Sequence, residues 1–249
     1  MDDLSKLIKL KREAKEVSNK TRHSNFQIIS GMYYDNISSP IFSIPLNANR
    51  RGLDSDQWDY VRFRTLELLA EELSKSSCHG SLAEVGVFRG DFAHIINGIF
   101  PKKKLYLFDT FAGFDEDSIT KDSETGFTSS GFLNLLPEFK NTSVSSVLDK
   151  MPFPETCVIC EGLFPESAKG LDDTFCLVSI DVDFYELTMD ALLYFYPKLV
   201  KHGYILVHDY NHDELCGPKK AIENFQNNGM NLCKVPIADQ CGTLILVKP

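Results

Sequence analysis

The sequence predicts an α/β fold with a mostly parallel sheet, helices on both faces and an antiparallel hairpin at its end. From residue 81 to residue 227, short apolar segments alternate with segments of helical periodicity. The runs VSID and ILVHD are apolar almost to their last residue, which is typical of strands buried on both faces. Strands that are separated by helices need right-handed crossovers and therefore run parallel.

Each element can be placed along the chain. A helix is expected after Ser55, a plausible N-cap, and it should end before Gly80. Two final strands surround a DQCG turn, which indicates the hairpin. The expected strands lie at 81–87, 104–109, 157–162, 175–181, 203–209, 231–237 and 243–249, and the other helices at 92–100, 142–151, 186–200 and 218–227.

Two segments stand apart from this alternation and define the domain organisation. Residues 1–54 are expected to form an N-terminal arm or cap, and residues 55–249 the main domain. Within that domain, residues 110–141 are long and polar, which is typical of a functional lid or insertion. The aromatic-rich cap could serve equally as a lid or as the interface of a homo-oligomer.

Composition excludes several classes of protein. The chain has 249 residues, 43% of them hydrophobic, and its net charge of −9 opposes general nucleic-acid binding. No apolar run is long enough for a membrane span, and the charged N-terminus lacks the apolar core of a secretory signal. Seven scattered cysteines favour free thiols in a reducing cytoplasm.

A glycine-containing turn follows the first expected strand. The pattern Glu84-x-Gly86-x-x-x-Gly90 is followed by Asp109 at the end of the second strand, where a carboxylate can accept both hydroxyls of a ribose. The turn lacks the second glycine that makes room for a pyrophosphate, so S-adenosylmethionine fits better than NAD. A tight turn with a helix-capping aspartate is the structural alternative. The predicted cofactor-binding residues are Glu84, Gly86, Gly90, Asp109, Thr110 and Phe111.

Acidic residues and a histidine gather at the ends of the fourth and fifth expected strands. Asp181 and Asp209 should lie at neighbouring strand tips, where two unpaired carboxylates would repel each other. A divalent cation would resolve this conflict, and His208 could supply a nitrogen ligand. If the strand continues, Asp183 lies on the same side as Asp181. The alternative is two solvated aspartates, one capping the following helix, with a structural histidine.

Four segments together resemble a known family. They are EVGVFRGDFAH, LFDTFAGFDE, SIDVDFYELTMDALLYFYPKLVKHGYILVHDY and GPKKAIENF, which span roughly residues 80–227. They resemble the macrocin O-methyltransferase family of antibiotic-sugar methyltransferases. The resemblance implies a Rossmann-like class I methyltransferase fold with a seven-stranded sheet. It also implies S-adenosylmethionine as the donor and magnesium-dependent transfer to a sugar hydroxyl.

The resemblance also assigns roles to individual residues. Asp181, His208 and Asp209 match the family's metal ligands, and Asp183 matches its proposed general base. Glu84, Gly86 and Asp109 match the cofactor cradle. Val182 stands where the family usually has glycine, and His208 where it has an acidic residue. The loss of one negative charge at 208 makes manganese an alternative to magnesium.

The sequence therefore predicts an enzyme that methylates a hydroxyl of a sugar or glycoside. Two alternatives stay open. A metal-dependent glycosyltransferase would also use an Asp-x-Asp motif such as 181–183, although it leaves the glycine turn unexplained. An inactive protein of methyltransferase fold, acting as a binding partner, would account for the departure at His208.

Overall fold

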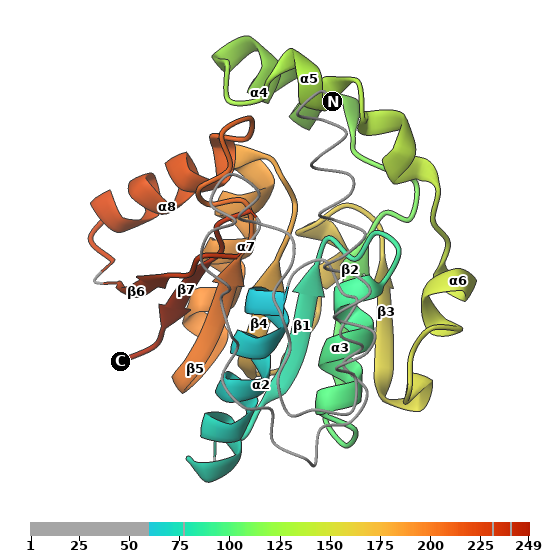
Figure 1. Cartoon of the computed structure of the whole chain (residues 1–249), viewed down its shortest axis with the longest axis vertical. Coiled ribbons are helices and arrows are strands. Elements are labelled where there is room, and N and C mark those ends of the chain that lie inside the picture. Colours follow the sequence, from blue (N-terminus) through green and yellow to red (C-terminus); the bar gives the residue numbers. More distant parts are fainter. Residues whose placement is uncertain (1–59, 77, 231, 240) are drawn as a thin grey trace, which may run out of the picture. The chain divides into compact units, whose positions relative to one another are not determined.

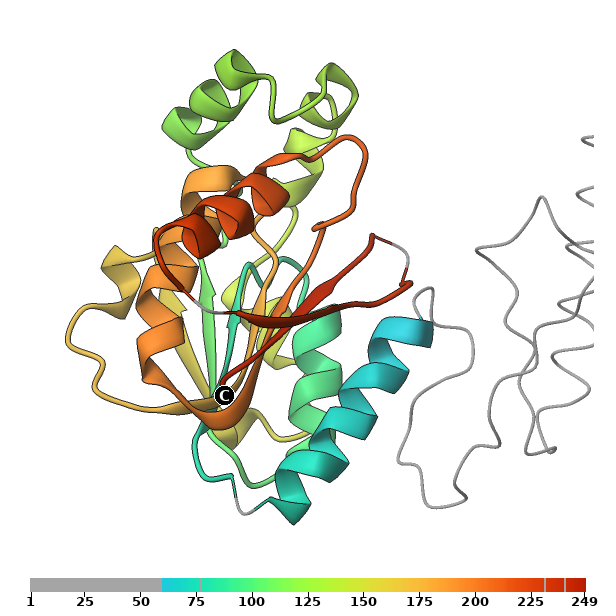
Figure 2. The same ribbon diagram turned by 90° about the vertical axis from the view of Figure 1, so that its left-hand side faces the viewer.

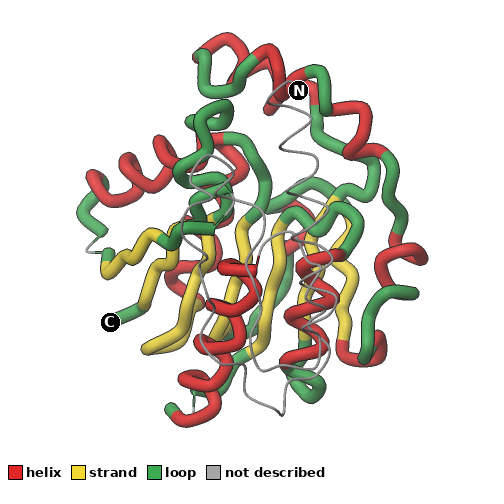
Figure 3. The backbone as a smooth tube through the Cα atoms, in the orientation of Figure 1, coloured by secondary structure: helices red, strands yellow, loops and turns green. Residues whose placement is uncertain are grey.

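A single seven-stranded sheet forms the centre of the domain that the structure describes, with the strand order β3-β2-β1-β4-β5-β7-β6. This computed structural model describes residues 60–76, 78–230, 232–239 and 241–249. The expected arm or cap at 1–54 and the N-cap at Ser55 lie outside these residues. Strands β1 to β5 are parallel, whereas β7 runs antiparallel to both β5 and β6 (Figures 1 and 3).

The strands confirm the predicted order of elements. They are β1 Ser81–Val85, β2 Leu105–Asp109, β3 Cys157–Glu161, β4 Phe175–Ile180, β5 Leu199–Val207, β6 Cys233–Pro236 and β7 Leu244–Val247. All six residues of β4 are buried, as its apolar sequence predicts for a central strand. Strand β5 begins four residues earlier than expected, because the chain turns directly from a helix into extended backbone at Leu199.

Helices cover both faces of the sheet. The α-helices are α2 Tyr60–Lys75, α3 Asp91–Ile99, α4 Glu116–Thr125, α5 Ser130–Leu133, α6 Val144–Leu148, α7 Tyr185–Lys198 and α8 Gly217–Asn227. Short 3₁₀ helices are η1 Leu136–Lys140, η2 Pro154–Thr156 and η3 Glu166–Ala168. Helices α2 and α3 lie on one face, and α7 and α8 on the other (Figures 1 and 2). The helix expected at 142–151 is shorter, covering only α6.

The polar segment 110–141 is helical and is attached to the main domain. It carries α4, α5 and η1, which lie beyond the carboxyl ends of the parallel strands (Figures 1 and 2). Phe132 packs with Phe184 and Leu215 in a small hydrophobic cluster, and Thr128 forms a β-bridge with Leu215. Asp122 accepts a 2.9 Å hydrogen bond from the backbone N–H of Tyr185, the first residue of α7.

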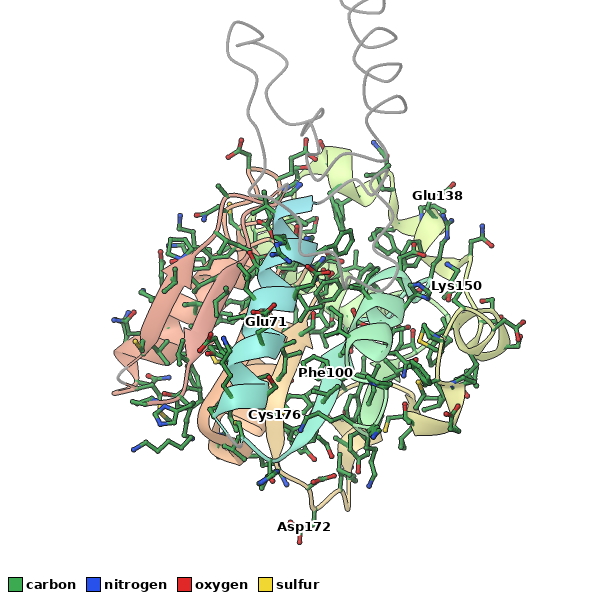
Figure 4. All side chains as sticks on the ribbon, turned by 60° about the horizontal axis from the view of Figure 1, so that its bottom comes forward. Glu71, Phe100, Glu138, Lys150, Asp172 and Cys176 are labelled. Carbon is green, nitrogen blue, oxygen red and sulfur yellow. The ribbon has the colours of Figure 1, made fainter. Side chains whose placement is uncertain are left out.

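The two edges of the sheet differ in their loops. At the amino edge, Asp172 lies in the short connection that leads into β4 (Figure 4). The predicted site residues lie at the carboxyl edge, with Glu84 and Asp109 near the ends of β1 and β2 and the others in the loops that follow. No helix in the described part of the chain has the length and apolar character required to cross a membrane.

Candidate active site

The turn after β1 contacts the end of β4 through backbone atoms. Gly86 has a φ of +84°, and a Cβ at this position would lie 1.8 Å from the carbonyl oxygen of Asp181. The N–H of Asp181 also donates to the carbonyl of Val85 at 2.9 Å. Only glycine fits here, because both the left-handed backbone and the close approach exclude a side chain. The glycine predicted from the sequence is therefore required by the chain itself.

Glu84, on β1 beside this turn, is a buried carboxyl group with an incomplete set of hydrogen bonds. The residue is 1% exposed, and its Oε2 atom has no hydrogen-bond partner in the described residues. Burial raises the pKa of Glu84 well above its usual value, despite the nearby positive charge of Arg62. Buried polar atoms are normally hydrogen-bonded, so an orphaned oxygen at a strand end suggests a place for a ligand donor.

Asp109, at the end of β2, holds the turn between β1 and α3. Its Oδ2 accepts hydrogen bonds from the backbone N–H groups of Val87, at 2.7 Å, and Phe88, at 2.8 Å. Its Oδ1 accepts from the N–H of Phe111 at 2.7 Å. This resembles the structural alternative, although the carboxylate caps turn amides and not a helix. Its predicted ribose contact stays a prediction.

The remaining predicted cofactor residues have visible roles in their own turns. A Cβ at Gly90, which has a φ of +77°, would lie 3.0 Å from Val147 Cγ1, so this glycine makes room for α6. The Thr110 hydroxyl donates to the carbonyl of Gly113 at 2.5 Å. Phe111 adopts a φ of +51° in the same turn. Contact of these residues with a cofactor also stays a prediction.

Three carboxylates meet where β4 and β5 end. Ligand atoms of Asp181, Asp183 and Asp209 all lie within 4.8 Å of one another. The sequence analysis expected Asp183 to lie beside Asp181 if the strand continued. Strand β4 ends at Ile180, so Asp183 reaches the cluster in another way. A tight turn brings it back, in which the N–H of Phe184 donates to the carbonyl of Val182 at 2.6 Å.

Both Asp183 and Asp209 have left-handed backbone, with φ values of +61° and +55°. Their residues are 8% and 4% exposed. Non-glycine residues in this conformation are uncommon and cluster at functional sites, although aspartate tolerates it better than most. Two buried carboxylates are therefore brought together by residues with strained backbone conformations.

The pKa values of two carboxylates in the cluster are shifted in opposite directions. Burial, together with the carboxylates of Asp209 and Asp181, raises the pKa of Asp183 well above its usual value. Burial acts in the same direction on Asp181, but the positive charges of His208 and Arg62 outweigh it and hold its pKa well below the usual value. Asp183 thus binds a proton more readily than Asp181 does.

His208 lies between two of the carboxylates. Its Nδ1 is 2.9 Å from Asp181 Oδ1 and 2.9 Å from Asp209 Oδ2. Burial would lower the pKa of His208, but the adjacent carboxylates raise it well above its usual value. The structure therefore brings together all four residues predicted from the strand ends, and it places a nitrogen between two oxygens.

Arg62 is a site residue that the sequence analysis missed. From α2 it forms a 3.1 Å ion pair with Asp181 Oδ2, and its guanidinium lies 3.8 Å from the ring centroid of Phe92. The signal was its spacing, because Arg62 shares the buried stripe of α2 with Leu66 and Ala70, at intervals of four residues. A charged residue on such a stripe indicates a buried partner.

Cys241 is the second missed residue. Its sulfur and ligand atoms of His208 and Asp209 lie within 4.8 Å of one another. Burial raises the pKa of the Cys241 thiol. The signal was topological, because Leu244 of β7 pairs antiparallel with Val207 of β5, which brings Cys241 to the carboxyl edge.

The donor set fits a divalent cation. Three carboxylates this close repel one another, and a cation bound between them would relieve the repulsion. Carboxylate oxygens are preferred by magnesium and manganese, whereas the imidazole suits manganese and softer ions.

Comparisons with known proteins identify the family of the chain. The model of the macrocin-O-methyltransferase (TylF) family matches residues 58–243. Demethyldecarbamoylnovobiocin O-methyltransferase of Streptomyces niveus is 26% identical over 196 residues, which cover 74% of this chain and 70% of that protein.

Two solved structures share the fold. The O-methyltransferase NovP has a TM-score of 0.62 at 19% identity, covering 75% of this chain and 79% of that one. The calicheamicin methyltransferase CalS11 has a TM-score of 0.52 at 19% identity, covering 74% and 79%. These likenesses confirm the predicted methyltransferase fold, and the family match decides against a glycosyltransferase. The chain belongs to the macrocin-O-methyltransferase family and is an O-methyltransferase.

Proposed function

We propose that this protein transfers a methyl group from S-adenosylmethionine to a hydroxyl of a sugar or glycoside, with a divalent cation bound at the site. The observation that carries the proposal is the cluster of Asp181, Asp183 and Asp209 beside the glycine turn. The proposal of a sugar acceptor rests on membership of the family, because resemblance to this family implies transfer to a sugar hydroxyl.

The residues around β1 suit the methyl donor. The orphaned Oε2 of Glu84 needs a hydrogen-bond donor, and the amino group of S-adenosylmethionine is one. Asp109 keeps acceptor capacity after its three backbone hydrogen bonds, because a carboxylate offers about four lone-pair sites. S-adenosylmethionine supplies an electrophilic methyl group.

Asp181, Asp209 and His208 would hold the cation, with magnesium as the first candidate and manganese as the alternative. A bound divalent cation lowers the pKa of a hydroxyl beside it. Arg62 then limits the negative charge on Asp181 and fixes its orientation from α2.

Asp183 is the proposed general base. Its raised proton affinity, caused by burial and two neighbouring carboxylates, suits it to accept a proton from the acceptor hydroxyl. The acceptor oxygen forms its bond to the methyl carbon as the carbon–sulfur bond breaks. Holding both substrates in line supplies much of the rate enhancement. Helices α4 and α5 lie beyond the strand ends, where they can exclude water.

We also infer a reducing compartment such as the cytoplasm. All seven cysteines are in described residues, and all are free thiols.

The decisive experiment is calorimetric titration with S-adenosylhomocysteine in the presence of magnesium, manganese or a chelator. We expect micromolar binding in all three conditions, because the donor residues are separate from the cation ligands. The Asp181→Asn variant should bind equally well yet show no methyl transfer to a panel of glycosides. Absence of binding would refute the donor assignment, and full turnover by Asp181→Asn would refute the cation site.

A further inference from the structure

The carboxyl edge carries two overlapping groups of potential metal ligands. Among the described residues, one group is Asp181, Asp183 and Asp209, and the other is His208, Asp209 and Cys241. The first offers oxygen only, whereas the second offers nitrogen, oxygen and sulfur. Asp209 belongs to both groups, and His208 is also a proposed ligand of the cation for methyl transfer, so an ion in one place excludes an ion in the other.

The thiol is held at this place by the backbone. The N–H of Asn211 donates to the carbonyl of Gly242 at 3.2 Å. Gly242 has a φ of +69°, and a Cβ there would lie 2.5 Å from the Cβ of Asn211. The turn is closed on its other side by Asp239, whose Oδ1 accepts from the N–H of Thr243 at 2.6 Å. Cys241 therefore sits in a turn packed directly against the segment that follows Asp209.

The residues of the second group are also buried enough to bind an ion away from bulk solvent. The side chains of His208 and Asp209 are 13% and 6% exposed, and Cys241 is partly buried. Such a group leaves open positions for water or substrate around a bound ion, as sites with three protein ligands do.

We propose that His208, Asp209 and Cys241 form a second cation site that takes a borderline or soft divalent ion, such as Zn²⁺ or Co²⁺. Thiolate and imidazole select such ions, whereas magnesium prefers oxygen ligands alone. This site therefore differs from the cation site for methyl transfer in the ions it selects, because Cys241 replaces Asp181 beside the shared His208 and Asp209. This inference goes beyond the proposed methyl transfer and is tested without it.

The test is titration of the reduced full chain with Co²⁺, followed by absorption spectroscopy. Cobalt bound to a thiolate gives an intense charge-transfer band in the near ultraviolet. We expect this band in the wild-type chain and its loss in Cys241→Ser, with Co²⁺ affinity reduced at least about tenfold. Cys233→Ser, which changes an exposed cysteine on β6, is the matched control and should keep the band.

A second measurement needs no variant. Zn²⁺ should slow alkylation of Cys241 in the wild-type chain, as measured by peptide mapping, and leave alkylation of Cys233 unchanged. A wild-type chain without the band, a band that persists in Cys241→Ser, or alkylation of Cys241 that ignores Zn²⁺ would overturn the proposal. Binding of S-adenosylhomocysteine in the same preparations reports separately on the proposed function.

Discussion

Asp109 and Asp183 are the same residue type at the same edge of one sheet, yet their surroundings are opposite. Three backbone N–H groups donate to Asp109, so both of its carboxylate oxygens are hydrogen-bonded within the fold. Burial, together with two neighbouring carboxylates, raises the pKa of Asp183. The comparison teaches that the position of an acid at a strand end does not define its role. The hydrogen-bond donors and charges around the carboxylate determine whether it supports the fold or can take part in the chemistry.

The largest expected effect is on catalysis at Asp183. Asp183→Asn keeps the shape of the side chain but cannot accept the proton, so turnover should fall about 10²–10⁴-fold. Affinity for S-adenosylhomocysteine should be unchanged, which calorimetry checks. Asp213→Asn, at an exposed position in the loop after β5, is the control and should keep its activity. Unchanged turnover in Asp183→Asn would assign the proton to another group.

The same substitution should change stability in opposite directions at the two positions. Asp109→Asn replaces an acceptor oxygen by a donor against backbone N–H groups, which should lower the free energy of unfolding by roughly 1–3 kcal/mol. Asp183→Asn removes a buried charge from a repulsive cluster, which should raise it by roughly 0.5–2 kcal/mol. Urea denaturation in chelator measures both changes. Shifts of the same sign would show that the surroundings of the two acids are not opposite in effect.

Asp122, in α4, is an intermediate case with one backbone hydrogen bond. Burial raises its pKa from 3.8 to about 6, so the folded chain binds this proton more tightly than the unfolded chain. The stability that its protonation contributes is complete below pH 3.8 and is lost as the pH rises through about 6. Between pH 5 and pH 7 the loss should be about 1 kcal/mol. Asp122→Asn should remove this part of the pH dependence in urea denaturation, and an unchanged profile would contradict it.

Most of the fold could be predicted from the sequence, because apolar runs and helical periodicity report burial directly. All seven strands lie within or near their expected ranges. Strand ends also identified Asp181 and Asp209, since parallel strands place their carboxyl ends together. Asp183 was predicted to join them, although a left-handed turn and not a continued strand brings it there.

What the sequence did not show depends on contacts between distant segments. Arg62 lies 119 residues before Asp181, and its role follows only from the way α2 packs on the sheet. Cys241 reaches His208 because β7 runs antiparallel beside β5. The hydrogen bonds of Asp109 were also hidden, because local patterns report side chains and not the direction of the backbone N–H groups around them.

The contact between Gly86 and the carbonyl of Asp181 restricts how this chain can diverge. Backbone atoms of the glycine turn and of the carboxylate cluster are in direct contact, with no side chain between them. An insertion or substitution in one segment would therefore displace the other. These two segments must change together during evolution or engineering. Residues 110–141 also attach close to this contact, because Asp122 accepts from the N–H of Tyr185, four residues after Asp181. We therefore expect that exchange of this segment would also displace the carboxylate cluster.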